Sequence, residues 1–179
     1  MSEPKEGAGP TDPSRAKSDA VEAGGVSADA YGVTEDREGG RHRGREVALQ
    51  VLYAIDLATD HEGPPRELQD QIFRRVADNF DVPRTAEKFA RELVVGVIRQ
   101  IEALDEILGL HARNWRVSRM AAVDRNVLRL AVFELRDSEL PVAIVIDEAI
   151  DLARRFGSDA SPSFVNGVLD AAAREVRAA

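Results

Sequence analysis

The run Arg41-His42-Arg43-Gly44-Arg45 brings together the side chains of this sequence that are best able to bind an anion. It falls at the expected first turn of a helix, where exposed cations oppose the helix dipole at about 0.3–1 kcal/mol each. Arginine forks match phosphate oxygens, and the free N–H groups of a first turn also attract anions. The run is a candidate site for RNA or another polyanion. A solubilising cluster and a docking site for the acidic N-terminal segment are alternative interpretations.

A second polar set, Asp147, Glu148 and Asp151, could form a carboxylate metal site, because residues 147 and 151 are one helical turn apart. No His lies nearby and two arginines follow, which favours a solvated helix face. The sequence has no GxxxxGK[ST], GxGxxG or GxSxG motif, and its three His lie in separate segments. Without Cys, disulfides, Cys-ligated metals and thiol catalysis are excluded. We therefore expect no enzymatic activity, no metal and no cofactor.

Composition and charge narrow the class of protein further. The 179 residues, 44% of them hydrophobic and few aromatic, suit one domain of packed helices. A net charge of −8 disfavours nucleic acid, yet residues 1–40 hold nine acids and four bases. The remainder is close to neutral and has room for a basic patch. No apolar run approaches the roughly 20 residues of a membrane span, so we expect a cytoplasmic protein without a membrane partner.

The order of elements follows from apolar spacing. Residues 1–40 hold seven Gly and three Pro without an apolar period, which predicts a disordered acidic tail before one helical domain at 41–179. Apolar residues three and four apart predict helices at about 43–58, 68–80, 85–109, 120–135, 141–156 and 161–176. At about 1.5 Å per residue, the third would run roughly 40 Å and could join two bundles. The predicted fold class is all-α.

Several ordered motifs resemble those of the NusB family of transcription antitermination factors. The segment Phe164-Val165-Asn166-Gly167-Val168-Leu169-Asp170 is similar to the family signature F-V-N-G-(V/I)-L-D, and residues 141–157 resemble the helix before it. Residues 45–53 resemble the opening R-E-x-A-x-Q-x-L-Y helix. Asp105, Asn114-Trp115 and residues 123–135 resemble I-D-x-x-I, N-W and V-D-R-x-(I/V)-L-R segments. The similarity covers about residues 41–176.

The resemblance implies a fold and a function. The expected fold is NusB-like, with two packed three-helix-type bundles and six to seven helices in all. Family members pair with the ribosomal protein NusE, and the pair binds boxA-type single-stranded RNA of ribosomal RNA leaders. The assembly joins other Nus factors and RNA polymerase and helps the enzyme read through terminators. The resemblance implies no catalysis.

Site residues are carried over by matching position. The arginine-rich start that binds RNA in the family corresponds to Arg41, His42, Arg43 and Arg45. Tyr53 and Phe164 are expected near RNA as rings on which bases stack. The alternatives are a half-buried helical Tyr at 53 and core packing of Phe164.

Other matching positions have expected structural or partner roles. Asn166 is expected to satisfy polar groups between the bundles, Gly167 to permit close backbone approach, and Trp115 to pack. Asp124 and Arg125 are candidate contacts to the protein partner, with a surface ion pair as the alternative.

The sequence departs from the family pattern at three positions. Ser163 replaces a frequent Lys, which predicts weaker RNA binding without a partner, while Asp147 replaces Asn and Phe89 replaces Tyr of some relatives.

Two competing functions use the same fold. The first is the N-terminal RNA-binding domain of an RNA cytosine methyltransferase, against which the absence of Cys and the ten residues after Leu169 argue. The second is a homodimer that buries its RNA-binding face and acts only as a protein adaptor.

Overall fold

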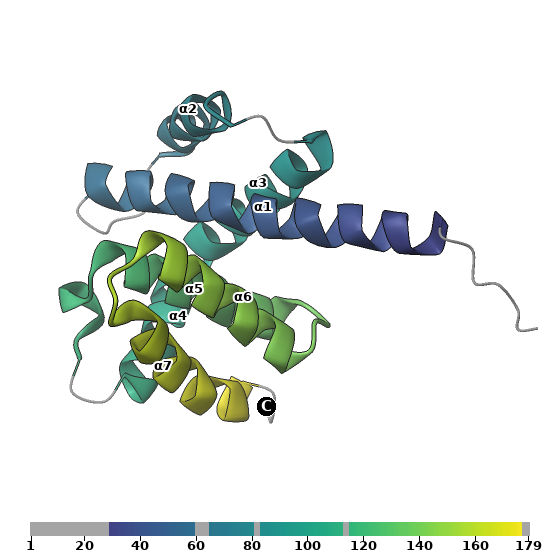
Figure 1. Ribbon diagram of the computed structural model, residues 1–179. Helices are drawn as coiled ribbons and strands as arrows, with labels where there is room; N and C mark the ends of the chain where they lie inside the picture. The colour runs from purple at the N-terminus through teal and green to yellow at the C-terminus, as the bar shows by residue number, and fades with distance from the viewer. Residues whose placement is uncertain (1–28, 60–64, 81–82, 113–114, 177–179) are drawn as a thin grey trace, which may run out of the picture.

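Seven α-helices and one short 3-10 turn make up a computed structural model that describes residues 29–59, 65–80, 83–112 and 115–176, with side chains from residue 40 onward. No strand occurs within these ranges, so the predicted all-α class is confirmed. The helices, labelled in Figure 1, are α1 (Asp29–Ala58), α2 (Arg66–Ala77), α3 (Arg84–Arg99), α4 (Ile101–His111), α5 (Ala122–Asp137), α6 (Val142–Phe156) and α7 (Ser161–Val176), with the 3-10 turn η1 at Val117–Arg119.

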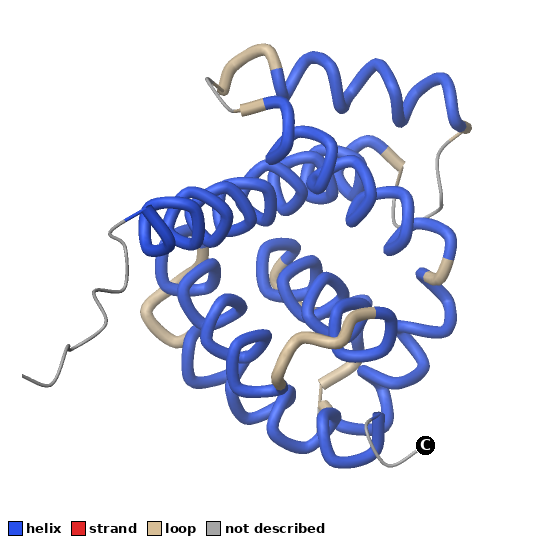
Figure 2. Tube along the Cα trace, turned by 90° about the vertical axis from the view of Figure 1, so that its right-hand side faces the viewer, coloured by secondary structure: helices blue, strands red, loops and turns tan. Residues whose placement is uncertain are grey.

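The described helices form two groups that meet along α1 and α5. In the first group α1 contacts α2 and α3, and in the second α5 contacts α4, α6 and α7. Figure 1 shows α1 lying between α2 and the group formed by α5, α6 and α7. Figure 2, turned by 90°, shows the long first helix lying across the helices below it. The contact of α1 with α5 joins the two groups into one structure.

The single helix predicted at 85–109 is instead two helices. At Gln100 the backbone leaves the helical region (φ −115°, ψ 12°), and α4 starts at the next residue. The apolar spacing continues through this break, so periodicity could not reveal it. Because α3 packs on α1 whereas α4 packs on α5 and α7, the bend carries the chain from one bundle to the other.

The first helix is longer than predicted. It starts at Asp29 instead of residue 43, so residues 29–40 of the predicted tail belong to α1. Residues 1–28, the rest of that predicted tail, lie outside the described residues. Once the later turns of α1 are packed, adding a helical residue at the end requires no new nucleation.

Buried charges hold α5 in the centre of the structure. Arg125 donates to the carboxylate of Asp56 on α1 at 2.5 Å, and Asn126 donates to the same oxygen at 3.1 Å. Arg129 donates to both oxygens of Asp105 on α4, at 2.7 and 2.6 Å, and its NH1 lies 3.5 Å from Asp56. Charges removed from water need such partners. The network therefore joins α1, α4 and α5 through charged and polar side chains, which the sequence alone would place on the surface.

Close packing of α3 on α5 depends on Gly96. A Cβ at this position would lie 2.2 Å from Cζ of Phe133 and within 2.9 Å of two more atoms of that ring. We expect Gly96→Ala to destabilise the fold by about 1–3 kcal/mol, because the ring and the helix must separate. Urea unfolding followed by circular dichroism measures the change. Gly109→Ala is the control, since a Cβ there meets nothing within 4 Å and Ala favours helix by about 1 kcal/mol. Equal or reversed effects would contradict the packing argument.

Candidate nucleic-acid interface

Two arginines near the start of the packed part of α1, Arg41 exposed and Arg43 partly exposed, lie over aromatic rings. The guanidinium of Arg41 is 5.4 Å from the centroid of Phe89 on α3, and that of Arg43 is 4.9 Å from Phe80, which follows α2. A guanidinium group can stack on the face of such a ring, and the N–H groups along its own edge remain free to donate hydrogen bonds to other acceptors. The structure therefore places Arg41 and Arg43 where their N–H groups can reach an anion from solvent.

Arg45 has a different role from the one expected. Its side chain is buried, and its Nε and NH2 donate to the two carboxylate oxygens of Glu134 on α5, both at 2.8 Å. A second carboxylate, Glu148 on α6, lies 3.7 Å from its NH1. The prediction that Arg45 binds RNA is therefore wrong, because its guanidinium is used inside the fold. The R-E motif had not distinguished an exposed arginine from a buried one.

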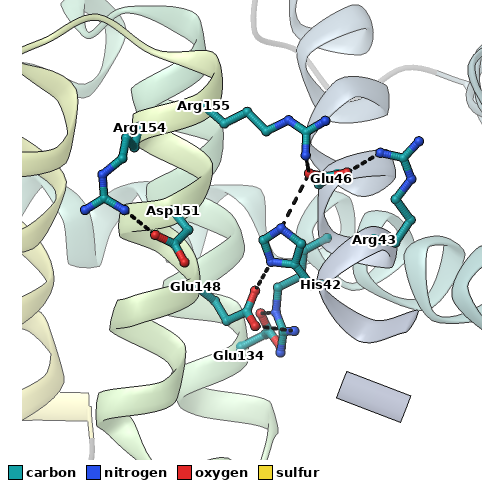
Figure 3. A network of polar contacts seen from close by, with 9 residues as sticks. His42, Arg43, Glu46, Glu134, Glu148, Asp151, Arg154 and Arg155 are labelled. Carbon is teal, nitrogen blue, oxygen red and sulfur yellow. Dashed lines mark hydrogen bonds and ion pairs between the residues drawn. The ribbon is translucent and has the colours of Figure 1, made fainter. Parts of the chain in front are cut away.

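His42 connects α1 with α6. Its Nδ1 lies 2.8 Å from Oε2 of Glu148 and its Nε2 lies 3.4 Å from Oε1 of Glu46. Figure 3 shows the ring between these two carboxylates, one from each helix. The acidic set on α6 is thus divided among partners: Glu148 faces His42, while Asp151 pairs with Arg154 on its own helix. These carboxylates do not converge on one point.

The carboxylate of Glu46 contacts three basic side chains. Only 1% of its side chain is exposed, yet it contacts the guanidinium groups of Arg43 and Arg155 and the imidazole ring of His42. Arg155 comes from the last turn of α6 and lies over the ring of Phe156 at 5.3 Å. Sequence reasoning treated Arg155 only as part of a solvated helix face. No local signal could identify it, because 109 residues separate it from Glu46.

The hollow beside Tyr53 lies further along α1. Tyr53 is 38% exposed and lines a hollow of about 340 Å³ between α1, α5 and α6, whose other lining residues are Leu49, Gln50, Val123 and Phe156. Leu57, one turn after Tyr53, is also exposed. At about 1.5 Å per residue, Tyr53 is roughly 15 Å along the helix from Arg43. A mixed aromatic and apolar surface therefore follows the cationic one.

Trp115 and Phe164 form a second aromatic group. Their ring centroids are 5.7 Å apart with the planes at 63°, an edge-to-face arrangement. The sequence predicts that Trp115 packs, and it does contact Phe164, but from the surface, because 55% of the residue is exposed. Phe164 is half-buried at the start of α7 and packs partly against the core. The position of Phe164 agrees with core packing, and part of its ring remains accessible to solvent. Asn114, the neighbour of Trp115 in the N-W motif, lies outside the described residues.

Comparison with known proteins identifies the family. Residues 42–174 match the model of the NusB family. The chain belongs to the NusB family. Among its relatives, the transcription antitermination protein NusB of Anaeromyxobacter dehalogenans strain 2CP-1 is 48% identical over 131 residues, 73% of this chain and 87% of the relative. The NusB of Myxococcus xanthus is 41% identical, over 74% of this chain and 93% of the relative.

Solved NusB structures share the fold. T. maritima NusB is similar with a TM-score of 0.66 and 32% identity, covering 75% of this chain and 91% of that one. A chain of the crystal structure of antitermination factors NusB and NusE in complex with dsRNA has a TM-score of 0.64 and 31% identity. The match covers 76% of this protein and 97% of that chain. The expected NusB-like fold is therefore confirmed. The relatives from Anaeromyxobacter dehalogenans and Myxococcus xanthus both bear the name transcription antitermination protein NusB.

Four assignments that came from the NusB resemblance can now be placed. Arg125 is buried and donates to Asp56 and, at 2.8 Å, to the carbonyl of Met120, which argues against the predicted contact with a protein partner. Asp124 is also buried, which rules out an ordinary surface ion pair. Asn166 donates to Asp170 of its own helix at 3.3 Å instead of bridging the bundles.

Gly167 differs from expectation as well, because a Cβ there would meet nothing within 4 Å. Close backbone approach therefore does not explain this position of the family signature.

No candidate for a membrane-spanning helix, which must be both long and apolar, occurs among the described residues.

Proposed function

We propose that this protein is an RNA-binding transcription antitermination adaptor. Together with NusE it binds boxA RNA of ribosomal RNA leaders and helps RNA polymerase read through terminators. Other Nus factors and RNA polymerase are partners through the complex, which acts in the cytoplasm. The observation that carries the proposal is a pair of solvent-accessible guanidinium groups, those of Arg41 and Arg43, held on aromatic rings in a NusB-family fold.

The chemistry of this surface suits single-stranded RNA. Arg41 and Arg43 supply planar forks for phosphate oxygens, which give affinity and register without reading sequence. Unpaired bases can stack on accessible rings, and Trp115 and Tyr53 are the most exposed aromatic side chains among the described residues. A solved relative that contains NusB, NusE and double-stranded RNA supports RNA as the class of ligand.

The hollow beside Tyr53 supports a protein partner. Tyr53 lines the hollow and Leu57, one turn further along α1, is also exposed. Exposed apolar patches rimmed by polar groups often bind proteins. Asp124 follows the lining residue Val123, and its buried Oδ1 has no hydrogen-bond partner among the described residues. We assign this region to NusE, which the solved relative with NusB and NusE supports as partner.

The double variant Arg41→Ala/Arg43→Ala tests the RNA surface. We expect the affinity for a labelled boxA-type RNA to fall at least about tenfold, since two charge-assisted contacts are lost. The dependence of log K on log salt should flatten by about 1.4, or about 0.7 for each phosphate released. Titrations with and without NusE over a range of salt concentrations measure both quantities.

Arg136→Ala/Arg174→Ala is the matched control, because it removes two exposed arginines from the ends of α5 and α7. Equal affinity of the two double variants would remove Arg41 and Arg43 from the site. A wild-type chain that binds no RNA even with NusE would overturn the proposal. Sedimentation or size-exclusion measurements would then test the homodimeric protein adaptor.

A further inference from the structure

Glu46 presents an electrostatic problem for the proposed RNA surface. It is a carboxylate directly beneath the exposed cations, where its charge should repel the phosphates that the surface is meant to bind. Burial of an ion also costs free energy unless its partners are well placed. With 1% of its side chain exposed, Glu46 nonetheless pairs with two guanidinium groups, that of Arg43 on its own helix and that of Arg155 on another helix. Such an arrangement indicates a role in placing these cations.

Its partners meet from two sides of the surface. Arg43 on α1 donates from NH1 to Oε2 of Glu46 at 2.5 Å, and Arg155 at the end of α6 donates from NH1 to Oε1. Figure 3 shows the two guanidinium groups approaching the carboxylate from the two helices. Each guanidinium has five N–H donors, and each of these two bonds uses only the Nη1 nitrogen. The Arg155 side chain is 57% exposed, so its remaining donors are accessible from solvent.

We propose that Arg155 contacts RNA phosphate and that Glu46 positions it together with Arg43. The inference rests on the proposed RNA-binding function and extends its site from α1 to α6. Arg155 is held on one side by Glu46 and lies over the ring of Phe156. An arginine fixed in this way loses less side-chain entropy when it binds a phosphate. Glu46 is a positioning residue and does not touch the RNA.

The neighbouring Arg154 provides a matched control. It has the same side chain on the same helical turn, is 65% exposed, and pairs with Asp151 of α6. It therefore carries the same charge into the same region without a contact to Glu46. A general electrostatic effect would make the two arginines equivalent, whereas positioning by Glu46 makes only Arg155 important.

The first experiment titrates labelled boxA-type RNA with the full chain and NusE. We expect Arg155→Ala to weaken binding roughly tenfold and to flatten the salt dependence by about 0.7, the value for one phosphate contact. Arg154→Ala should change affinity by less than about twofold. A wild-type chain that binds no RNA overturns the proposed function as well. Wild-type binding with equal affinities of the two variants overturns this inference alone.

The RNA affinity of Glu46→Gln tests the role of Glu46, because the two explanations predict changes in opposite directions. If Glu46 only adds negative charge, Glu46→Gln should strengthen RNA binding. If Glu46 positions the arginines, the same variant should weaken binding roughly fivefold to tenfold. Adding Arg155→Ala to Glu46→Gln should then cost less than about twofold more, because Arg155 is already misplaced. Tighter binding by Glu46→Gln, or a full additional loss in the double variant, overturns the positioning role.

A folding check accompanies this variant, since Glu46 lies inside the structure. Circular dichroism and thermal unfolding establish whether Glu46→Gln is folded. If it is not, Glu46→Asp keeps the charge but draws the carboxylate back by one methylene. Weaker RNA binding and a flatter salt dependence are then expected, and an affinity equal to wild type contradicts the inference.

Discussion

Asp56→Asn should lower the free energy of unfolding by about 3–5 kcal/mol, the usual cost of removing one partner from a buried ion pair. Asp56 and its partner Arg125 are each 3% exposed at the side chain, and Arg129 also approaches the same carboxylate. The amide keeps the shape of the side chain but removes the charge that balances Arg125. Two-state urea unfolding measures the loss, and the melting temperature should fall by about 6–20 °C.

Asp70→Asn is the control for this prediction. Asp70 accepts from Arg91 at 2.7 Å, a distance similar to that between Asp56 and Arg125, but both side chains are substantially exposed. An exposed pair contributes about 0–1 kcal/mol. If both variants lost the same stability, burial of the network on α5 would not explain its contribution.

Arg45→Met should also destabilise the fold by about 3–5 kcal/mol, because Glu134 would remain charged and buried without its bidentate partner. The methionine fills much of the volume of the arginine stem, which reduces the contribution of an empty cavity. At a temperature where the variant is folded, its RNA affinity should stay within about threefold of wild type, since the buried guanidinium does not face solvent. Urea unfolding and RNA titration together separate the two effects.

Removing both charges distinguishes a broken pair from poor packing. Arg45→Met/Glu134→Met should recover much of the lost stability, because a buried ion pair can often be replaced by apolar side chains at little cost. Arg43→Ala, two residues away and partly exposed, should cost less than about 1 kcal/mol. A double variant as unstable as Arg45→Met would show that Glu134 is not the reason for the loss.

These outcomes would show that the arginines of residues 41–45 have two different functions, RNA binding and stabilisation of the fold. Arg41 and Arg43 face solvent over aromatic rings, whereas Arg45 is bonded to the central helix α5. A variant that replaces all three arginines would therefore lose stability and RNA contacts at once. Binding experiments on this surface need variants that leave Arg45 in place.

Apolar spacing determined the helical class and the approximate position of most helices. It worked because a helix packed on one side must repeat apolar residues every three or four positions, as at residues 142–156. The ordered motifs also indicated the NusB family, which the match over residues 42–174 confirms. These features depend on residues close together in the sequence, so they can be recognised without knowledge of the packing.

Only the tertiary structure decided which polar residues are buried and which meet. The spacing of charged residues looks the same on a solvated face as on a helix surrounded by partners, so Arg125 and Arg129 could not be recognised as interior ion pairs. The bend at Gln100 was hidden because the apolar pattern continues through it. Contact between Glu46 and Arg155 depends on how α1 and α6 pack, since no local pattern relates residues 109 positions apart.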